Sequence, residues 1–285
     1  MKLHKFTQSI GVPTHFVSLD EAAKVEPFVR ATVGILESPT TGIIDSHGYM
    51  QYLLGSFLEH SGDIAYHSTV TSISPIGPSP GITGYTITAR DDTTREESSF
   101  TASTLINSAG LSACTISNLL LPPSRHRTPF YAKGNYFSYN ASTPRATRLI
   151  YPAPEPGLGG LGTHLTLDMS GALRFGPDVE WVDSPSDLSV STSRLREAVQ
   201  EIKKYMPGID EERLMPDYAG IRPKLGRTSA VAASGGKGAG KGSFVDFYIR
   251  EEDGFKGFVN LLGIESPGLT ASLAIAEEVE GLLYR

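Results

Sequence analysis

The stretch Phe258-Val259-Asn260-Leu261-Leu262-Gly263-Ile264-Glu265-Ser266-Pro267-Gly268-Leu269-Thr270, followed by residues 271–283, decides how this chain folds. Its apolar first half predicts a buried strand that runs through Gly263 into a tight turn. Ser266 is a favourable N-cap and Pro267 suits the first helical position, so we expect an amphipathic helix beyond them. Gly263 and Gly268 would let the backbone approach a ligand closely, and the helix N-terminus would add a positive dipole. The turn would suit an anion or an electron-rich ring, while an ordinary strand-to-helix connection fits the same residues.

A second stretch repeats this arrangement earlier in the chain. Residues 104–107 predict a strand, the small residues 108–113 a turn, and the residues up to Leu120 a helix. Two units of this kind predict one parallel sheet with a ligand at the carboxyl ends of its strands. The expected fold class is therefore α/β (α+β).

Composition and charge exclude several classes of protein. Hydrophobic residues make up 39% of the chain and charged residues 20%, which is ordinary for a globular protein. The net charge of -6 and the lack of a basic run argue against a nucleic-acid partner. No apolar run is long enough to span a membrane, and the first residues resemble neither a secretory signal nor a mitochondrial presequence. The single cysteine, Cys114, excludes an internal disulfide framework, and the spacing of the histidines predicts no metal site.

The middle of the chain differs from its two ends in being rich in strand-like segments joined by Pro and Gly turns. We therefore expect a β-rich lobe over residues 125–256, inserted between two pieces of an α/β lobe, residues 1–124 and 257–285. Along the whole chain, the strand-like segments are residues 64–73, 84–89, 99–106, 130–139, 148–151, 162–167, 172–175, 217–221 and 244–250. The first three of these precede the β-rich lobe, and the other six lie within it. We expect two short helices before residue 30 and longer ones over residues 47–60 and 191–205. Ser18 and Glu21 predict a capping box at the start of the second short helix.

Two glycine-rich stretches match the residue pattern of nucleotide-binding motifs but lack the structural context that these motifs require. Residues 157–162 fit G-x-G-x-x-G, but prolines precede them and a strand-like segment follows, so the strand and helix that this fingerprint needs are missing. Residues 235–242 resemble a P-loop but carry Gly242 where Ser or Thr must reach Mg²⁺. We interpret both as loops.

Three residues are candidates for chemistry. His164 lies within a strand-like segment, where a neutral imidazole could accept a hydroxyl proton near physiological pH, although a lone strand histidine is more often structural. Arg222 ends a strand, with Lys224 two positions on, and such a pair could grip a carboxylate or form a surface salt bridge. Lys133, beside Gly134, is a further cation that alone indicates little. The sequence contains no G-x-S-x-G nucleophile elbow.

Taken together, these stretches resemble the FAD-dependent oxidoreductases of the D-amino-acid-oxidase (DAO) type, most closely the branch that oxidises L-2-hydroxyglutarate. The matching stretches run in family order and are residues 38–45, 106–111, 162–166, 220–225, 246–247 and 260–270. The resemblance implies FAD as cofactor, a small 2-hydroxy acid as substrate, and a quinone pathway in mitochondria as the destination of the electrons. An amino acid, an N-methylated amine and glycerol phosphate remain alternative substrates, and a non-catalytic remnant is an alternative of another class.

The resemblance also implies roles for individual residues. His164, in the family's G-x-H-x-T strand, would be the catalytic base; Arg222 would hold the substrate carboxylate, with Lys133 and Thr166 nearby. The residues that would contact FAD are Val70 at the adenine, Ser108, Ala109 and Gly110 in the first turn, and Gly263, Ser266, Pro267, Gly268, Leu269 and Thr270 in the second. Family members begin with a strand, G-x-G-x-x-G, a helix and an acidic residue, a unit that these 285 residues do not contain. We therefore expect a truncated gene product.

Overall fold

The predicted strand of the closing stretch forms as β13, Phe258–Leu262, and every one of its residues is buried. The computed structural model describes residues 2–153, 163–227 and 246–284. In it, β13 pairs parallel with β6, Leu105–Asn107, so that Asn260 lies opposite Asn107. β12, Tyr248–Glu251, runs antiparallel along the other edge of β13. The predicted parallel pairing is confirmed, and the third strand comes from a segment that we had expected in the β-rich lobe.

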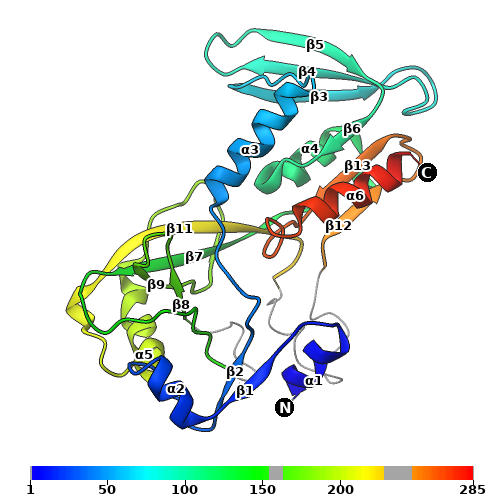
Figure 1. The fold of residues 1–285 in the computed structure, drawn as a ribbon. Helices are drawn as coiled ribbons and strands as arrows, with labels where there is room; N and C mark the ends of the chain where they lie inside the picture. The colour runs from blue at the N-terminus through cyan, green and yellow to red at the C-terminus, as the bar shows by residue number, and fades with distance from the viewer. Residues whose placement is uncertain (1, 154–162, 228–245, 285) are drawn as a thin grey trace.

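Helices cover both faces of this three-stranded sheet (Figure 1). α6, Ser272–Leu283, packs on the face of Val259 and Leu261 through Val279. α4, Ala113–Leu120, lies with Phe258 on the other face, where a meander of three antiparallel strands completes a second apolar cluster. The meander consists of β3, Ser68–Pro75, β4, Tyr85–Asp91, and β5, Glu97–Ala102.

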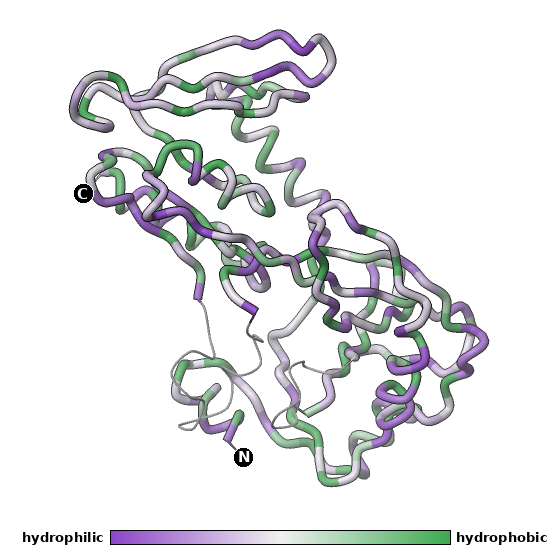
Figure 2. The backbone as a smooth tube through the Cα atoms, turned by 180° about the vertical axis from the view of Figure 1, so that it is seen from behind, coloured by the Kyte–Doolittle hydropathy of each residue, from purple (hydrophilic) through white to green (hydrophobic). Residues whose placement is uncertain are grey.

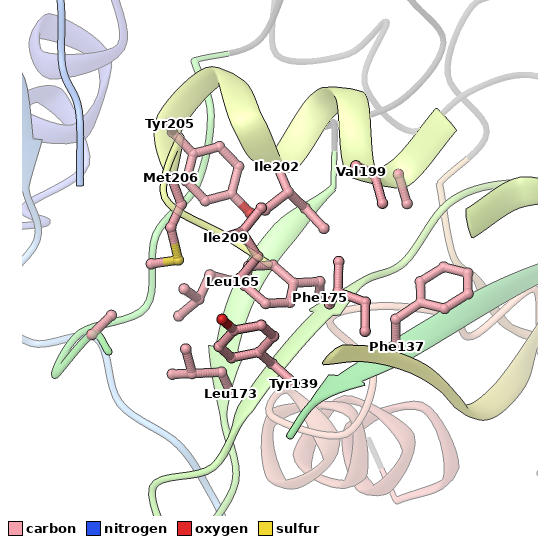
Figure 3. Close-up of a cluster of buried hydrophobic side chains, with 13 residues drawn as sticks. Phe137, Tyr139, Leu165, Leu173, Phe175, Val199, Ile202, Tyr205, Met206 and Ile209 are labelled. Carbon is pink, nitrogen blue, oxygen red and sulfur yellow. The ribbon is translucent and has the colours of Figure 1, made fainter. Parts of the chain in front are cut away.

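The β-rich lobe is built on two long strands, β7, Phe130–Tyr139, and β11, Leu214–Lys224, which pair antiparallel. The other edge of β7 holds β9, Leu173–Gly176, and β10, Glu180–Val182, and β8, His164–Leu167, pairs with β9. α5, Leu195–Tyr205, packs on one face of this sheet. Figure 3 shows its side chains meeting Phe137, Leu165 and Phe175, all three of which are fully buried. Short 3-10 helices span Gly110–Ser112 (η1), Pro123–Arg125 (η2), Thr192–Arg194 (η3) and Glu211–Arg213 (η4).

Residues 26–37 contact the β-rich lobe, although we had expected the first 124 residues in the α/β lobe. The first 37 residues form α1, Lys2–Ser9, β1, His15–Val17, α2, Leu19–Val25, and β2, Ile35–Glu37. Ser18 caps α2 by accepting a hydrogen bond from the Glu21 amide, as predicted. The buried Glu26 carboxylate accepts a hydrogen bond from the Thr147 amide at 3.0 Å, and the Arg30 amide donates to the Tyr205 carbonyl. These contacts hold the segment around Glu26 and Arg30 against the β-rich lobe.

α3, Ser46–Glu59, runs from the β-rich lobe to the meander (Figure 1). It begins at the N-cap Asp45, whose carboxylate accepts a hydrogen bond from the Gly48 amide. None of its residues is buried, although hydrophobic residues recur along it (Figure 2). A helix of this composition normally buries an apolar stripe against its neighbours.

Other predictions differ in detail. Residues 148–151 form no strand, and Ile150 makes only an isolated bridge to Leu165. The strand predicted from residue 64 begins at Ser68. The two glycine-rich motifs, residues 157–162 and 235–242, lie outside the described residues.

Candidate active site

The alternation of side chains along β8, β9, β7 and β11 divides the sheet of the β-rich lobe into two faces. Leu165 and Phe175 point into the core beneath α5, so their neighbours His164, Thr166 and Arg174 lie on the opposite face. Arg222 pairs in register with Ala132. Ala132 and Ser138 lie six positions apart along β7 and therefore on the same side of it, and Ser138 pairs with Arg174, so Arg222 lies on the face of Arg174. We call it the open face. The structure thus places His164, Thr166 and Arg222 on one face of this sheet.

Tyrosines fill the open face between these residues. The rings of Tyr136 and Tyr218 stack with centroids 4.5 Å apart, and Tyr151 stacks on His164 at 4.2 Å. Burial, reinforced by Tyr218, raises the pKa of Tyr136 to about 12, while the nearby Arg222 opposes that shift. Tyr136 is therefore a protonated hydrogen-bond donor at neutral pH, beside the guanidinium.

Arg222 keeps its hydrogen-bonding capacity. It is partly buried, and within residues 2–153, 163–227 and 246–284 its guanidinium forms no hydrogen bond and no ion pair. The neighbouring cation, Lys224, donates instead to the Glu265 carboxylate at 2.5 Å, and both partners are largely buried. A partly buried guanidinium with free donors can bind a carboxylate in two parallel hydrogen bonds.

Lys133 does not join this group. It pairs in register with Ile221 and Glu180 and lies on the core side of the sheet, because it alternates with Ala132 and Gly134 along β7. Its ammonium group is 2% exposed and donates to Asp187 at 2.9 Å, with Glu180 at 3.5 Å. Burial favours its neutral form, but the hydrogen bond to Asp187 and the charge of Glu180 outweigh it and raise the pKa of Lys133. The predicted pairing of Lys133 with Arg222 is not found.

The turn after β13 differs from the prediction. α6 begins at Ser272 with Ala271 as N-cap, so Ser266 is not a cap and Pro267 does not open the helix. The reason is a turn with its own bonds: the Ala271 amide donates to the Pro267 carbonyl at 3.0 Å, and the Thr270 hydroxyl to the same atom. A Cβ on Gly268 would lie 2.7 Å from the Glu265 carbonyl oxygen, so this glycine is required by the turn itself.

The turn after β6 is open to a ligand. The Asn107 side-chain oxygen accepts a hydrogen bond from the Ala109 amide, and its amide group donates to the Asn260 side chain at 2.7 Å. Gly110 has a φ of +55°, and a Cβ added there would meet no atom within 4 Å. η1, which contains Gly110, contacts β11, the strand of Arg222. The turn of Ser108, Ala109 and Gly110 therefore leaves free space at Gly110, beside β11.

Of the remaining residues that the resemblance assigns to ligand contacts, Val70, Gly263 and Leu269 lie outside the β-rich lobe, and Thr166 lies on its open face. Val70 belongs to β3 of the meander, next to a β-bulge between Val70 and Ser72. Gly263 has a φ of +66° and faces Leu225, while Leu269 is exposed in the turn before α6. The Thr166 hydroxyl donates to the Arg174 carbonyl at 3.4 Å. The sequence alone did not indicate Tyr136, Tyr151 and Tyr218; the alternation of Tyr136 with the core residue Phe137 was the available signal.

Other classes of site are absent from the part of the chain that the structure describes. It holds no helix with the length and apolarity that crossing a bilayer requires. Within the same ranges no three His, Cys, Asp or Glu side chains gather as metal ligands would. Burial raises the pKa of the Cys114 thiol, which makes it a poor nucleophile.

Comparisons with known proteins agree with this geometry. The family model described as FAD-dependent oxidoreductase (DAO) matches residues 1–282. The mitochondrial L-2-hydroxyglutarate dehydrogenase of Arabidopsis thaliana is 33% identical over 303 aligned residues, which cover 93% of this chain and 59% of the relative. A glycerol 3-phosphate dehydrogenase of Caloramator mitchellensis is 25% identical and matches 99% of this chain and 53% of its own length.

The fold is also that of a solved flavoprotein. The L-alpha-glycerophosphate oxidase of Mycoplasma pneumoniae, with FAD bound, superposes with a TM-score of 0.77 at 21% identity. The superposition covers 100% of this chain and 70% of that structure. The chain therefore spans between half and two thirds of the length of the two curated relatives described above.

Proposed function

Because the chain belongs to the DAO family of FAD-dependent oxidoreductases, we propose that it carries the substrate site of a dehydrogenase that oxidises L-2-hydroxyglutarate to 2-oxoglutarate. FAD is the cofactor of this family. The observation that carries the proposal is the Arg222 guanidinium, partly buried and free of partners among the described residues, on the same sheet face as His164.

The residues present fit the cofactor. Gly110 leaves open the space that a side chain would fill, and Asn107 holds the Ala109 amide in place beside it. The turn of Ser108, Ala109 and Gly110 and the turn from Gly263 to Thr270 would hold FAD. When bound, the flavin supplies a hydride acceptor for the carbon that carries the hydroxyl group.

The protein's own residues position the substrate and take its proton. Arg222 binds the carboxylate next to the reacting carbon, and the Tyr136 phenol, which stays protonated and uncharged at neutral pH, lies near the guanidinium without competing for its charge. His164 accepts the hydroxyl proton on an imidazole nitrogen as the alcohol becomes a ketone. Tyr151 stacks on the His164 ring, and the Tyr205 hydroxyl holds the Thr163 carbonyl at 2.9 Å, so the ring is fixed before substrate arrives.

The charge balance of the site favours a carboxylate over a phosphate. A phosphate dianion is usually met by more than one cation. Here Lys133 and Lys224 are both paired with carboxylates, and among these three cations only Arg222 has no such partner in residues 2–153, 163–227 and 246–284. The identity of 33% to the Arabidopsis dehydrogenase, against 25% to the glycerol 3-phosphate enzyme, points the same way. The name of the Arabidopsis relative makes mitochondria the compartment that we propose.

A substrate panel tests this proposal. The protein is supplied with FAD and an artificial electron acceptor, and kcat/KM is measured on L-2-hydroxyglutarate, D-2-hydroxyglutarate, glycerol 3-phosphate, glycine and sarcosine. We expect L-2-hydroxyglutarate to exceed every other compound by at least about tenfold. Glycerol 3-phosphate, glycine and sarcosine lack the hydroxyl group next to a carboxylate that Arg222 and His164 would bind together. In the D enantiomer, the hydroxyl group and the hydrogen on C2 exchange places, so the two groups cannot face His164 and the flavin in the same way. An equal or higher value for glycerol 3-phosphate would replace the proposed substrate with a phosphorylated one.

A further inference from the structure

A network of hydrogen bonds connects Arg125 to the turn after β6. Arg125, at the end of η2, donates to one carboxylate oxygen of Glu252, which directly follows β12. The other carboxylate oxygen accepts a hydrogen bond from the Asn260 side-chain amide at 2.7 Å. The Asn260 oxygen accepts from the Asn107 side-chain amide at 2.7 Å, and the Asn107 oxygen accepts from the Ala109 backbone amide at 3.3 Å. We call these five residues the amide network.

The two asparagines of the amide network use all their side-chain donors. Glu252 and Asn107 are 3% exposed, and Asn260 is fully buried. The second N–H group of Asn260 donates to the Ser117 hydroxyl at 2.9 Å. The second N–H group of Asn107 donates to the Ala113 carbonyl at 2.8 Å. A buried network in which each donor has an acceptor is rigid, and the loss of one partner leaves another group unpaired.

Glu252 sets the direction of the hydrogen bonds in the amide network. An ionised carboxylate only accepts hydrogen bonds, a guanidinium only donates them, and a side-chain amide has one donating and one accepting end. Glu252 can therefore accept from Arg125 and from the NH2 group of Asn260 together. Asn260 then presents its oxygen to Asn107, and Asn107 presents its own oxygen to the Ala109 amide. The carboxylate at one end thus fixes which atom meets the turn at the other end.

We propose that Glu252 and Asn260 are positioning residues for the cofactor. They orient Asn107 so that its oxygen holds the Ala109 amide, and the turn after β6 is therefore ordered before FAD binds. The inference rests on the proposed function, which assigns this turn to FAD. An ordered turn loses less conformational freedom on binding its ligand, so it binds the ligand more tightly. Glu252 acts through two other side chains and does not need to touch the cofactor.

Glu252→Gln tests the direction of the network, because it keeps the size of the side chain and replaces one acceptor with a donor. Glutamine has one accepting oxygen, so Arg125 and Asn260 cannot both donate to it. Whichever way the amides turn, one contact between Arg125 and Ala109 then places two donors or two acceptors against each other. We expect the mismatch at the Ala109 contact, which is the longest of those that lead from Glu252 to the turn.

Two measurements follow the turn without any need for turnover. In the protein without FAD, the Ala109 backbone amide of Glu252→Gln should exchange its hydrogen at least about tenfold faster than in the parent, relative to the amides of β13. NMR measures these rates in the folded protein. FAD should bind the variant about tenfold more weakly, as measured by the change of flavin fluorescence on titration.

The double variant Glu252→Gln/Asn260→Asp restores the pattern of donors and acceptors. The glutamine can offer its oxygen to Arg125 and its NH2 group to the new carboxylate, which also accepts from Asn107. The Asn107 oxygen is then again available to the Ala109 amide. We expect this variant to recover most of the slow exchange at Ala109 and most of the FAD affinity. Two unrelated losses of stability would add up instead.

Glu26→Gln is the matched control. Glu26 is 4% exposed, and its carboxylate also lies beside an arginine, Arg148, at 3.5 Å. It holds the Thr147 amide in the β-rich lobe and has no place in the amide network. This variant should change neither the exchange at Ala109 nor the affinity for FAD.

Three results would overturn the inference. They are unchanged exchange at Ala109 in Glu252→Gln, no recovery in the double variant, and an equal effect of Glu26→Gln. If the parent protein did not bind FAD, the assignment of the turn to the cofactor would be wrong. The exchange rates would still decide whether Glu252 orders the turn, so the two failures are distinguishable.

Discussion

The two faces of the sheet in the β-rich lobe differ in what they contribute. On one face, Phe137, Leu165 and Phe175 pack beneath α5 with no exposed surface. On the other, their immediate neighbours Tyr136 and His164 line the candidate active site. Residues adjacent in sequence therefore serve stability on one side and chemistry on the other, and a substitution should affect one property or the other according to its face.

The largest expected effect is on stability. Phe137→Ala should lower the free energy of unfolding by about 3–5 kcal/mol, since it removes a fully buried ring and leaves a cavity. Tyr136→Phe, one residue away on the open face, should change it by less than about 0.5 kcal/mol. Urea unfolding of both variants checks the comparison. Equal losses would show that the two faces do not divide stability from function.

A change at His164 should lower turnover more than it lowers stability. His164→Ala is expected to lower kcat at least about a hundredfold, because it removes the proposed base, and the loss of turnover should persist at urea concentrations and temperatures where the variant is fully folded. His15→Ala is the control, since His15 is a histidine of the exposed strand β1 that pairs only with Glu37 on the surface. Steady-state kinetics with L-2-hydroxyglutarate measure both variants. Retention of turnover within a few-fold would remove His164 from the mechanism.

A smaller loss is expected at Arg222. Arg222→Met should lower kcat/KM about 10- to 100-fold, mainly by raising KM, because a charged hydrogen bond contributes about 1.5–3 kcal/mol. Arg222→Lys should recover part of this, since the charge remains but the bidentate geometry is lost. The pKa of Tyr136 is about 12, so KM should not rise through ionisation of its phenol between pH 7 and 10. Kinetics across that range test both statements, and an unchanged KM in Arg222→Met would contradict the assignment.

The smallest expected effect is on the pH dependence of stability, at the ion pair of Asp187 and Lys133. The Ser189 side chain and then the Lys133 ammonium lower the pKa of Asp187 from 3.8 to about 2. Because the folded-state pKa lies below the unfolded value, this group contributes stability above pH 3.8 and loses it as the pH falls through about 2. Asp187→Asn should therefore show a shallower loss of stability between pH 5 and 2 than the parent protein. Identical slopes in denaturation series would mean that the pair does not contribute.

Alternation and apolar runs made much of this sheet predictable. The bounds of β7, residues 130–139, and the buried strand β13 follow from local residues alone. The stacking of Tyr136 on Tyr218 depends on how β7 pairs with β11, and the bond between Lys133 and Asp187 joins residues 54 apart in sequence. Such partners cannot be inferred from neighbours along the chain.

Local capping rules also gave a wrong start for one helix, where contacts beyond the local sequence determine the first residue. Ser18 caps α2, because the Glu21 amide donates a hydrogen bond to its hydroxyl oxygen, as the local pattern predicts. At Ser266 the following residues instead close a turn of their own, and α6 starts at Ser272. For α3, the sequence pattern predicted a helix with an apolar face, and the helix formed without a partner for that face among the described residues.

For protein engineering, the buried ion pair of Lys224 and Glu265 makes two distant segments a single exchangeable module. Lys224 ends β11, the strand of Arg222, and Glu265 lies in the turn after β13. Replacing one partner alone would leave the other charge buried and unpaired. A chimera that imports β11 from a relative must therefore import the relative's turn after β13 as well. A change of substrate specificity made through β11 would then require the replacement of both segments.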